Sequence, residues 1–352
     1  MKTKAAVLYE TGKPLVVETL DTPSLKDGQC LVKIFYSGVC HSQLNEMNAA
    51  KGEDKYLPHT LGHEASGTIE EIGPKVTKVK AGDYVVASWI KDSGLEASQI
   101  YYTKGEDKIN AGACATFSQY AVISENRLTK ISNKIPKDVA ALFGCPILTG
   151  GGMILNEINA KNGDSIAIFG IGGVGASALL VASSSRIFSE VIAVDINQKK
   201  LNLAKDLGAT RIINAKDKDP VKEIFEITNG KGVDYSLETA GSKKAMESAF
   251  YSTKPGSFGK NGGLTIIAGN TKRGELIEIY PFDLIKGRRI KGSWGGDALP
   301  GRDLPIYEKM YLDGKFPINK LITREYSLEE INQSLKDLEG GEECRIVINL
   351  EK

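Results

Sequence analysis

The sequence predicts an α/β protein of two domains, in which a doubly wound parallel sheet is inserted into a mostly β, discontinuous domain. Three observations lead to this prediction. The length of 352 residues exceeds the size at which one hydrophobic core stops growing. Strand patterns dominate the first third of the chain, whereas strands and helices alternate in its middle. The last segments have no partners of their own, so we assign them back to the first domain.

We expect the β domain to comprise residues 1–147 and 293–352 and the parallel-sheet domain residues 148–292. Polar, glycine-punctuated residues 91–112 indicate a loop with little core. Strand patterns separated by Asp-Gly, Gly-Pro and Gly-Asp turns lie at 5–9, 15–19, 30–37, 67–72, 84–87 and 117–123. Helix patterns follow at 140–145 and 150–158.

The middle of the chain repeats a strand–helix unit, which is typical of a parallel, doubly wound sheet. Its predicted strands are 166–169, 191–194, 211–214, 235–238, 264–268 and 290–293. Its predicted helices are 174–185, 199–207, 221–228 and 243–250. Helices at 305–312 and 328–338 and a strand at 344–350 complete the chain.

A Gly-x-Gly-x-x-Gly motif joins the first of these strands to its helix. Gly170 permits the tight turn, Gly172 lets the backbone approach a pyrophosphate, and Gly175 lets helix and strand pack closely. The N–H groups at the start of the helix then face the phosphates. The predicted cofactor loop therefore contains Gly170, Gly172, Gly173, Val174 and Gly175.

An acidic residue supports this interpretation and selects the cofactor. Asp195 ends the next strand, twenty residues after Gly175, where a carboxylate can accept hydrogen bonds from the adenosine ribose. The carboxylate would repel a 2′-phosphate, and no arginine follows it directly. We therefore expect NAD rather than NADP, with Lys200 as a second contact to the ribose.

Composition excludes several classes of function. The chain has 45 Lys and Arg against 44 Asp and Glu, and this balance argues against a nucleic-acid or membrane-surface partner. No secretory signal or run of 18 apolar residues occurs, so we expect a cytoplasmic protein that acts on small molecules. Five cysteines are too few and too scattered for a disulfide scaffold, and they remain free thiols or metal ligands.

Thiol and imidazole side chains occur in three separate places that could share a metal. Cys40, His63 and Cys145 offer the donors that zinc prefers, and a catalytic zinc site keeps three protein ligands and one open position. These residues are too far apart to form a local signature. For each cysteine the alternative role is that of a small apolar side chain buried in the core.

Motifs across nearly the whole chain resemble those of zinc-dependent medium-chain alcohol dehydrogenases, and they occur in the family's order. They comprise residues 38–42, 62–64, 82–83, 117–120, 144–145, 149–150, 170–175, 194–197, 232–235 and Arg345. The resemblance implies a GroES-like catalytic domain and an inserted Rossmann domain. It also implies hydride transfer between a primary or secondary alcohol and NAD, with aldehyde or ketone reduction in reverse.

The resemblance assigns a role to each residue of the metal site. It makes Cys40, His63 and Cys145 the ligands of one catalytic zinc, and Glu64 an acid that can approach the metal during ligand exchange. Ser42 matches the hydroxyl that hydrogen-bonds the substrate oxygen.

The resemblance also extends the cofactor site. His41 and Arg345 match basic positions facing the pyrophosphate, and Thr149 matches a threonine beside the nicotinamide. A surface position for His41 and a helix cap for Thr149 remain alternatives. His59 matches nothing and is interpreted as structural.

Three departures from the family pattern affect these expectations. Residues 91–112 contain no cysteine where members often bind a structural zinc, so we expect a single zinc per chain. Gln43 replaces an acid that commonly supports the zinc-bound histidine, and Asn45 replaces a proton-relaying histidine. The family's dimers and tetramers suggest a homodimer or homotetramer.

Two other functions stay open at this point. The same core could serve a polyol or sugar dehydrogenase, or a dehydrogenase of glutathione adducts of the S-hydroxymethylglutathione type. A non-catalytic NAD-binding module with a decayed metal site is supported only by Gln43 and Asn45.

Overall fold

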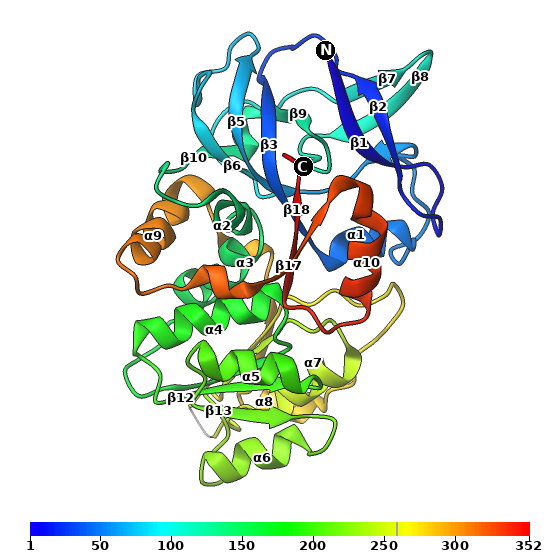
Figure 1. The fold of residues 1–352 in the computed structure, drawn as a ribbon. Helices are drawn as coiled ribbons and strands as arrows, with labels where there is room; N and C mark the ends of the chain where they lie inside the picture. Colours follow the sequence, from blue (N-terminus) through cyan, green and yellow to red (C-terminus); the bar gives the residue numbers. More distant parts are fainter. Residues whose placement is uncertain (258–259) are drawn as a thin grey trace. The chain divides into compact units, whose positions relative to one another are not determined.

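The computed structural model describes residues 1–257 and 260–352, which divide into two compact units (Figure 1). The first unit consists of Met1–Leu148 and Leu299–Lys352, and the second of Thr149–Ala298. The return to the first unit comes later than residue 293 because the Asn156 side chain donates hydrogen bonds to the carbonyls of Gly296 and Asp297. These bonds hold the residues after 293 in the second unit.

The first unit contains a closed barrel with strand order β1-β2-β7-β8-β4. Its strands are β1 (Lys2–Leu8), β2 (Val16–Asp21), β7 (Ile100–Lys104), β8 (Asp107–Gly112) and β4 (His59–Thr60). The loop predicted at 91–112 is therefore wrong over the β7–β8 hairpin. Ile100, Tyr102 and Ile109 are buried inside the barrel, whereas Tyr101, Thr103 and Lys108, which alternate with them, are exposed. The charged and glycine-containing turn at residues 104–107 hid a strand pattern of period two.

A second sheet of the first unit joins segments from both ends of the chain. The strand β18 (Arg345–Asn349) pairs antiparallel with β3 (Gln29–Val39), as the red and blue ribbons of Figure 1 show. The order is β10-β6-β5-β3-β18-β17, and β9 also pairs with β3. The other strands are β5 (Glu64–Ile72), β6 (Tyr84–Ser88), β9 (Tyr120–Ser124), β10 (Leu128–Lys130) and β17 (Ile322–Ser327).

Helices of the first unit pack around these sheets. They are α1 (His41–Met47), α2 (Lys137–Leu142), α9 (Pro300–Leu312) and α10 (Ile331–Glu339). The sequence did not predict α1. The helix predicted at 150–158 is instead α3 (Pro146–Gly152), followed by a π-helical turn at Met153–Glu157.

The second unit is a six-stranded parallel sheet with the order β13-β12-β11-β14-β15-β16, as the alternating pattern predicted. Its strands are β11 (Ser165–Phe169), β12 (Glu190–Asp195), β13 (Arg211–Asn214), β14 (Tyr235–Glu238), β15 (Leu264–Ile267) and β16 (Arg289–Gly292). Its helices are α4 (Gly173–Ser185), α5 (Gln198–Asp206), α6 (Pro220–Ile227), α7 (Lys243–Tyr251) and α8 (Pro281–Ile285). The strand order reverses beside β11, where sheets of this kind bind ligands at the strands' carboxyl ends.

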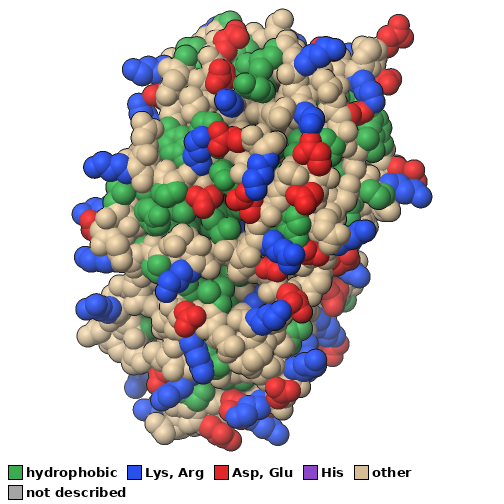
Figure 2. All heavy atoms as spheres, in the orientation of Figure 1, with side chains coloured by type: hydrophobic (Ala, Val, Ile, Leu, Met, Phe, Trp, Pro, Cys, Tyr) green, Lys and Arg blue, Asp and Glu red, His purple; other side chains and the backbone are tan. Residues whose placement is uncertain are grey.

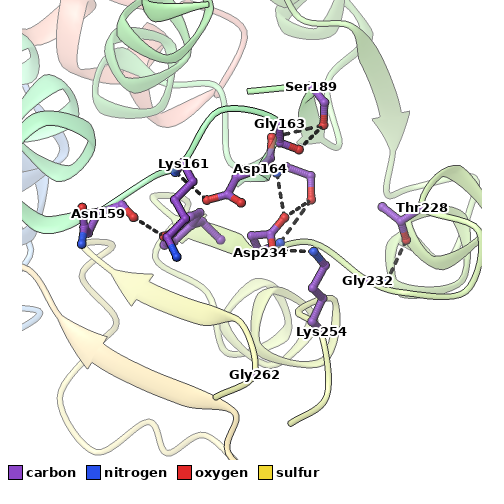
Figure 3. A network of polar contacts seen from close by, with 12 residues as sticks. Asn159, Lys161, Gly163, Asp164, Ser189, Thr228, Gly232, Asp234, Lys254 and Gly262 are labelled. Atoms are coloured by element: carbon purple, nitrogen blue, oxygen red, sulfur yellow. Dashed lines mark hydrogen bonds and ion pairs between the residues drawn. The ribbon is translucent and has the colours of Figure 1, made fainter. Parts of the chain in front are cut away.

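A polar network ties β11 to β14 at their amino-terminal ends (Figure 3). Asp234 accepts hydrogen bonds from the backbone N–H of Ser165 at 2.8 Å and from its hydroxyl at 2.9 Å, and it pairs with Lys254. Burial raises the pKa of Asp234, but Lys254 and Ser165 outweigh it and hold that pKa below its ordinary value. The network fixes the two central strands at the end away from the glycine motif.

Acidic and basic side chains alternate over the face shown in Figure 2, with no broad patch of one sign. This arrangement fits the charge balance of the sequence. Within residues 1–257 and 260–352, no helix is both long and apolar enough to cross a membrane.

Candidate functional site

Three metal-binding side chains of the first unit meet at one point. Cys40 lies between β3 and α1, His63 directly precedes β5, and Cys145 lies between α2 and α3. One ligand atom from each residue lies within 4.8 Å of the others. The chain therefore assembles two sulfur donors and one imidazole from elements that are distant in sequence.

The imidazole of His63 is held by one of its ring nitrogens. Its Nδ1 lies 2.6 Å from Nε2 of Gln43, whereas its own Nε2 is buried without a hydrogen-bond partner among the described residues. Gly62 enables this placement: its φ is +90°, and a Cβ there would lie 2.5 Å from Oγ1 of Thr116 and 2.8 Å from the backbone nitrogen of Phe117. The Nε2 atom of His63 is thus the one available to a metal.

The charges around Cys40 favour a thiolate. A hydrogen bond with Cys145 outweighs the opposing effect of burial, and His63 and Arg345 act in the same direction, so the pKa of Cys40 is well below its ordinary value. A thiolate is the form of cysteine that binds metals. Two cysteines and one imidazole, with an unpartnered Nε2, form a donor set that fits zinc and leaves a fourth position open.

Glu64 and Arg345 form an ion pair inside the second sheet of the first unit. Glu64 is fully buried, Arg345 is 4% exposed, and a Cβ on Gly38 would lie 2.5 Å from Oε1 of Glu64. The sequence led us to expect Arg345 to face a pyrophosphate and Glu64 to approach the metal. In the structure Arg345 pairs with Glu64 and also lies close enough to Cys40 to favour its thiolate.

The first turn of α1 presents polar groups to His63. The Oγ of Ser42 lies 3.3 Å from Nδ1 of His63, close enough for the half-buried hydroxyl to contact the metal ligand. His41 is exposed at the start of the same helix.

A cavity of about 630 Å³ in the first unit reaches His63. Its wall carries Lys51, Glu53 and Lys55, together with Asp54. His59, also on this wall, places Nε2 2.8 Å from Oδ2 of Asp54, which agrees with its interpretation as structural. No sequence pattern indicated this cavity, because its wall combines a loop with the unpredicted β8.

In the second unit, Asp195 organises the glycine motif. Its Oδ2 accepts a hydrogen bond from the backbone N–H of Ile171 at 2.6 Å, and its Oδ1 accepts one from Asn197 at 2.8 Å. A Cβ on Gly175 would lie 1.9 Å from the carbonyl oxygen of Gly170, so only glycine allows this approach of helix and strand. The N-cap of α4 is Gly172, which has no side chain to accept from the N–H groups of the first turn, so these groups can face an anion.

A cavity of about 240 Å³ adjoins this turn and is lined by Gly170, Asp195 and Ile196. Its position at the carboxyl end of β12 suits the adenosine half of a dinucleotide. Lys200 is half-buried on α5 in the same unit. Thr149 is buried, and its hydroxyl has no hydrogen-bond partner among the described residues.

Comparison with known proteins identifies the family. The family model described as "Alcohol dehydrogenase GroES-like domain" matches residues 26–133, and the one described as "Zinc-binding dehydrogenase" matches residues 173–309. The chain is 33% identical to the S-(hydroxymethyl)glutathione dehydrogenase of Saccharomyces cerevisiae, over 99% of this chain and 96% of that enzyme. The chain belongs to the zinc-dependent medium-chain alcohol dehydrogenases. It is therefore an oxidoreductase, as the sequence predicted.

Further members of the family cover the chain equally well. Alcohol dehydrogenase 1 of Trifolium repens is 31% identical, over 100% of this chain and 98% of that enzyme. The crystal structure of benzyl alcohol dehydrogenase from Acinetobacter calcoaceticus is 31% identical and superposes with a TM-score of 0.89, over 99% of both chains. These matches confirm the predicted combination of a GroES-like and a Rossmann domain.

This alcohol dehydrogenase also contains a buried acid that the sequence analysis missed. Glu238 ends β14, and its Oε1 accepts hydrogen bonds from the backbone N–H groups of Ala240 at 2.9 Å and Gly241 at 2.7 Å. Burial raises the pKa of Glu238 to about 7, against the effect of these donors. From the sequence Glu238 was predicted only as the last residue of a strand. The Ala240-Gly241 turn that follows, whose N–H groups it binds, could have indicated its buried position.

Polar contacts hold residues 91–99, which precede the β7–β8 hairpin. Glu125 accepts a hydrogen bond from the backbone N–H of Leu95 at 2.8 Å, and Glu96 pairs with Lys91 and Arg127. Burial alone would raise the pKa of Glu96, but its hydrogen bonds with Lys91, Asn126 and Arg127 lower that pKa to about 2. Of the apolar side chains in residues 91–112, Ile100, Tyr102 and Ile109 are buried, whereas Leu95 and Tyr101 are 41% and 44% exposed.

Proposed function

We propose that the chain oxidises a primary or secondary alcohol with NAD, and reduces the corresponding carbonyl with NADH, using one zinc per chain. The observation that supports this most is the meeting of Cys40, His63 and Cys145 within 4.8 Å. Zinc in this site would supply a Lewis acid for the substrate oxygen, and NAD would supply the hydride acceptor. Proton transfer and binding of the metal and cofactor are the functions of the chain's own residues.

We assign proton transfer to Ser42, whose hydroxyl lies beside the metal ligand His63. Glu64 would approach the metal during ligand exchange, and its ion pair with Arg345 would hold its carboxylate in place at other times. With Asn45 in place of a relaying histidine, the last proton step goes to water or to a ribose hydroxyl.

The second unit, with boundaries at 148–292 or 149–298, would bind NAD. The N–H groups at Gly172, Gly173, Val174 and Gly175 would bind the pyrophosphate, and Asp195 and Lys200 the adenosine ribose. The support is the uncapped start of α4 together with the carboxylate at the end of β12. His41, Arg345 and Thr149 are proposed as further cofactor contacts.

The experiment that tests this function measures zinc content and NADH formation with a panel of alcohols. We expect one zinc per chain, turnover with NAD well above that with NADP, and loss of both zinc and turnover in Cys145→Ala. A wild-type protein that holds no zinc and transfers no hydride from any alcohol would contradict the proposal.

A second candidate substrate class consists of polyols, sugars and glutathione adducts. The charged wall of the cavity beside His63, with Lys51, Glu53 and Lys55, favours it. Three relatives are themselves S-(hydroxymethyl)glutathione dehydrogenases. Comparing kcat/KM for S-hydroxymethylglutathione, sorbitol and benzyl alcohol separates the candidates.

We also propose a cytoplasmic homodimer or homotetramer. The strand β16 lies at one end of the parallel sheet, and in the same unit the side chains of Leu276 and Ile285 are 75% and 76% exposed. Light scattering of the wild type and of Ile285→Asp tests this, with a smaller particle expected for the variant.

A further inference from the structure

The amide of Gln43 lies between two groups of the metal site. Its Oε1 accepts a hydrogen bond from the backbone N–H of Cys40 at 2.8 Å, and its Nε2 lies 2.6 Å from Nδ1 of His63. Gln43 is 1% exposed, so water does not offer either group an easy substitute. Its two ends thus serve two different metal ligands.

The contact with His63 changes character when a metal binds. A neutral imidazole that gives Nε2 to a metal carries its proton on Nδ1, which then is a donor. The amide nitrogen of Gln43 is also a donor, so two N–H groups would face each other at the present contact. Reversing the amide would bring Oε1 to His63, but the NH₂ group would then face the N–H of Cys40. In either orientation one donor lacks an acceptor.

The neighbouring hydroxyl offers only a weak alternative. The Oγ of Ser42 is 3.3 Å from Nδ1 of His63, farther than the amide, and it also lies 3.4 Å from Nε2 of Gln43. A proton on Nδ1 would therefore still meet the amide first.

We propose that Gln43 is a positioning residue that weakens zinc binding, because its one acceptor oxygen is directed at the N–H of Cys40 while its NH₂ group faces metal-bound His63. This inference rests on the proposed zinc site. A carboxylate of the same length would accept from both donors, since each of its oxygens is an acceptor. The chain thereby holds its metal more loosely than its three ligands alone would allow.

The test measures the zinc affinity of the zinc-free protein by competition with a chromophoric chelator. Gln43→Glu should tighten zinc binding by about 10- to 100-fold, the size of effect that partners of metal-bound histidines usually have. Asn45→Asp is the matched control, because it adds the same charge to the same helix without replacing the group that contacts His63. Its affinity should stay close to that of the wild type.

A second variant keeps the inference testable if Gln43→Glu does not fold. Gln43→Met removes the amide donor that faces His63, so this variant should bind zinc at least as tightly as the wild type. If the amide of Gln43 instead helped the metal site, its removal would weaken zinc binding. An unchanged or weaker affinity in Gln43→Glu, an equal gain in Asn45→Asp, or weaker binding in Gln43→Met would each overturn the inference. A wild type that binds no zinc would instead overturn the proposed function.

Discussion

The ion pair between Glu64 and Arg345 allows a quantitative test of the first unit. Arg345→Met leaves a fully buried carboxylate without its charged partner, and breaking a buried pair in this way costs about 3–5 kcal/mol of unfolding free energy. Replacing both charges with Glu64→Gln and Arg345→Met removes the unpaired charge. The double variant should therefore recover most of the loss, to within about 1–2 kcal/mol of the wild type.

The two tryptophans make the measurement specific to one unit. Trp89 lies in the first unit and Trp294 in the second, so a Trp294→Phe background reports urea unfolding of the first unit through Trp89 alone. All proteins are compared without zinc. Arg324→Met is the control, since its ion pairs are exposed to solvent and should contribute little to stability. The reasoning is refuted if Arg345→Met costs no more than this control, or if the double variant is as unstable as Arg345→Met.

Four further outcomes are expected. Cys145→Ala should abolish zinc binding and turnover yet leave the NAD dissociation constant, measured by calorimetry, within about twofold, because the glycine motif belongs to the other unit. Gly175→Ala should lower the melting temperature, since its Cβ would lie 1.9 Å from a carbonyl oxygen, whereas Gly172→Ala meets no atom within 4 Å and should weaken only NAD binding. Asp195→Gly should shift the ratio of kcat/KM with NAD to kcat/KM with NADP about tenfold toward NADP. It should also weaken NAD binding, because the hydrogen bond from Asp195 to the glycine motif is lost. Burial alone would raise the pKa of Glu125, but hydrogen bonds from backbone N–H groups outweigh it and hold that pKa below 4.5. The ionised carboxylate of Glu125 therefore stabilises the fold at neutral pH, and this stabilisation is lost as acid protonates it. The stability deficit of Glu125→Gln in urea titrations should therefore shrink as the pH falls below about 4.5.

The parallel sheet was predictable because its information is local. Continuous apolar strands, the spacing of Gly170 to Gly175 and the acid at Asp195 all lie within one short stretch. The β7–β8 hairpin was missed because only one of its faces is buried and its turn, residues 104–107, is charged like a loop.

The metal site was predictable only through the family resemblance. Cys40, His63 and Cys145 meet by tertiary pairing of β3, β5 and the segment after α2, which no spacing in the sequence encodes. The ion pair of Arg345 with Glu64 depends on β18 lying beside β3, so nothing local to either residue indicated it.

The position of β18 inside a sheet also affects the order of events during synthesis. Domains generally fold as units while the chain grows, and the second unit is one continuous segment that is complete long before the last residues emerge. All three metal ligands of the first unit are synthesised early. The strand β18, which joins β3 to β17 in the sheet, is missing until Arg345–Asn349 leave the ribosome. Until then Glu64 lacks the charged partner that Arg345 supplies. A nascent chain stalled before residue 345 should accordingly resist protease in its second unit while its first unit is still cleaved.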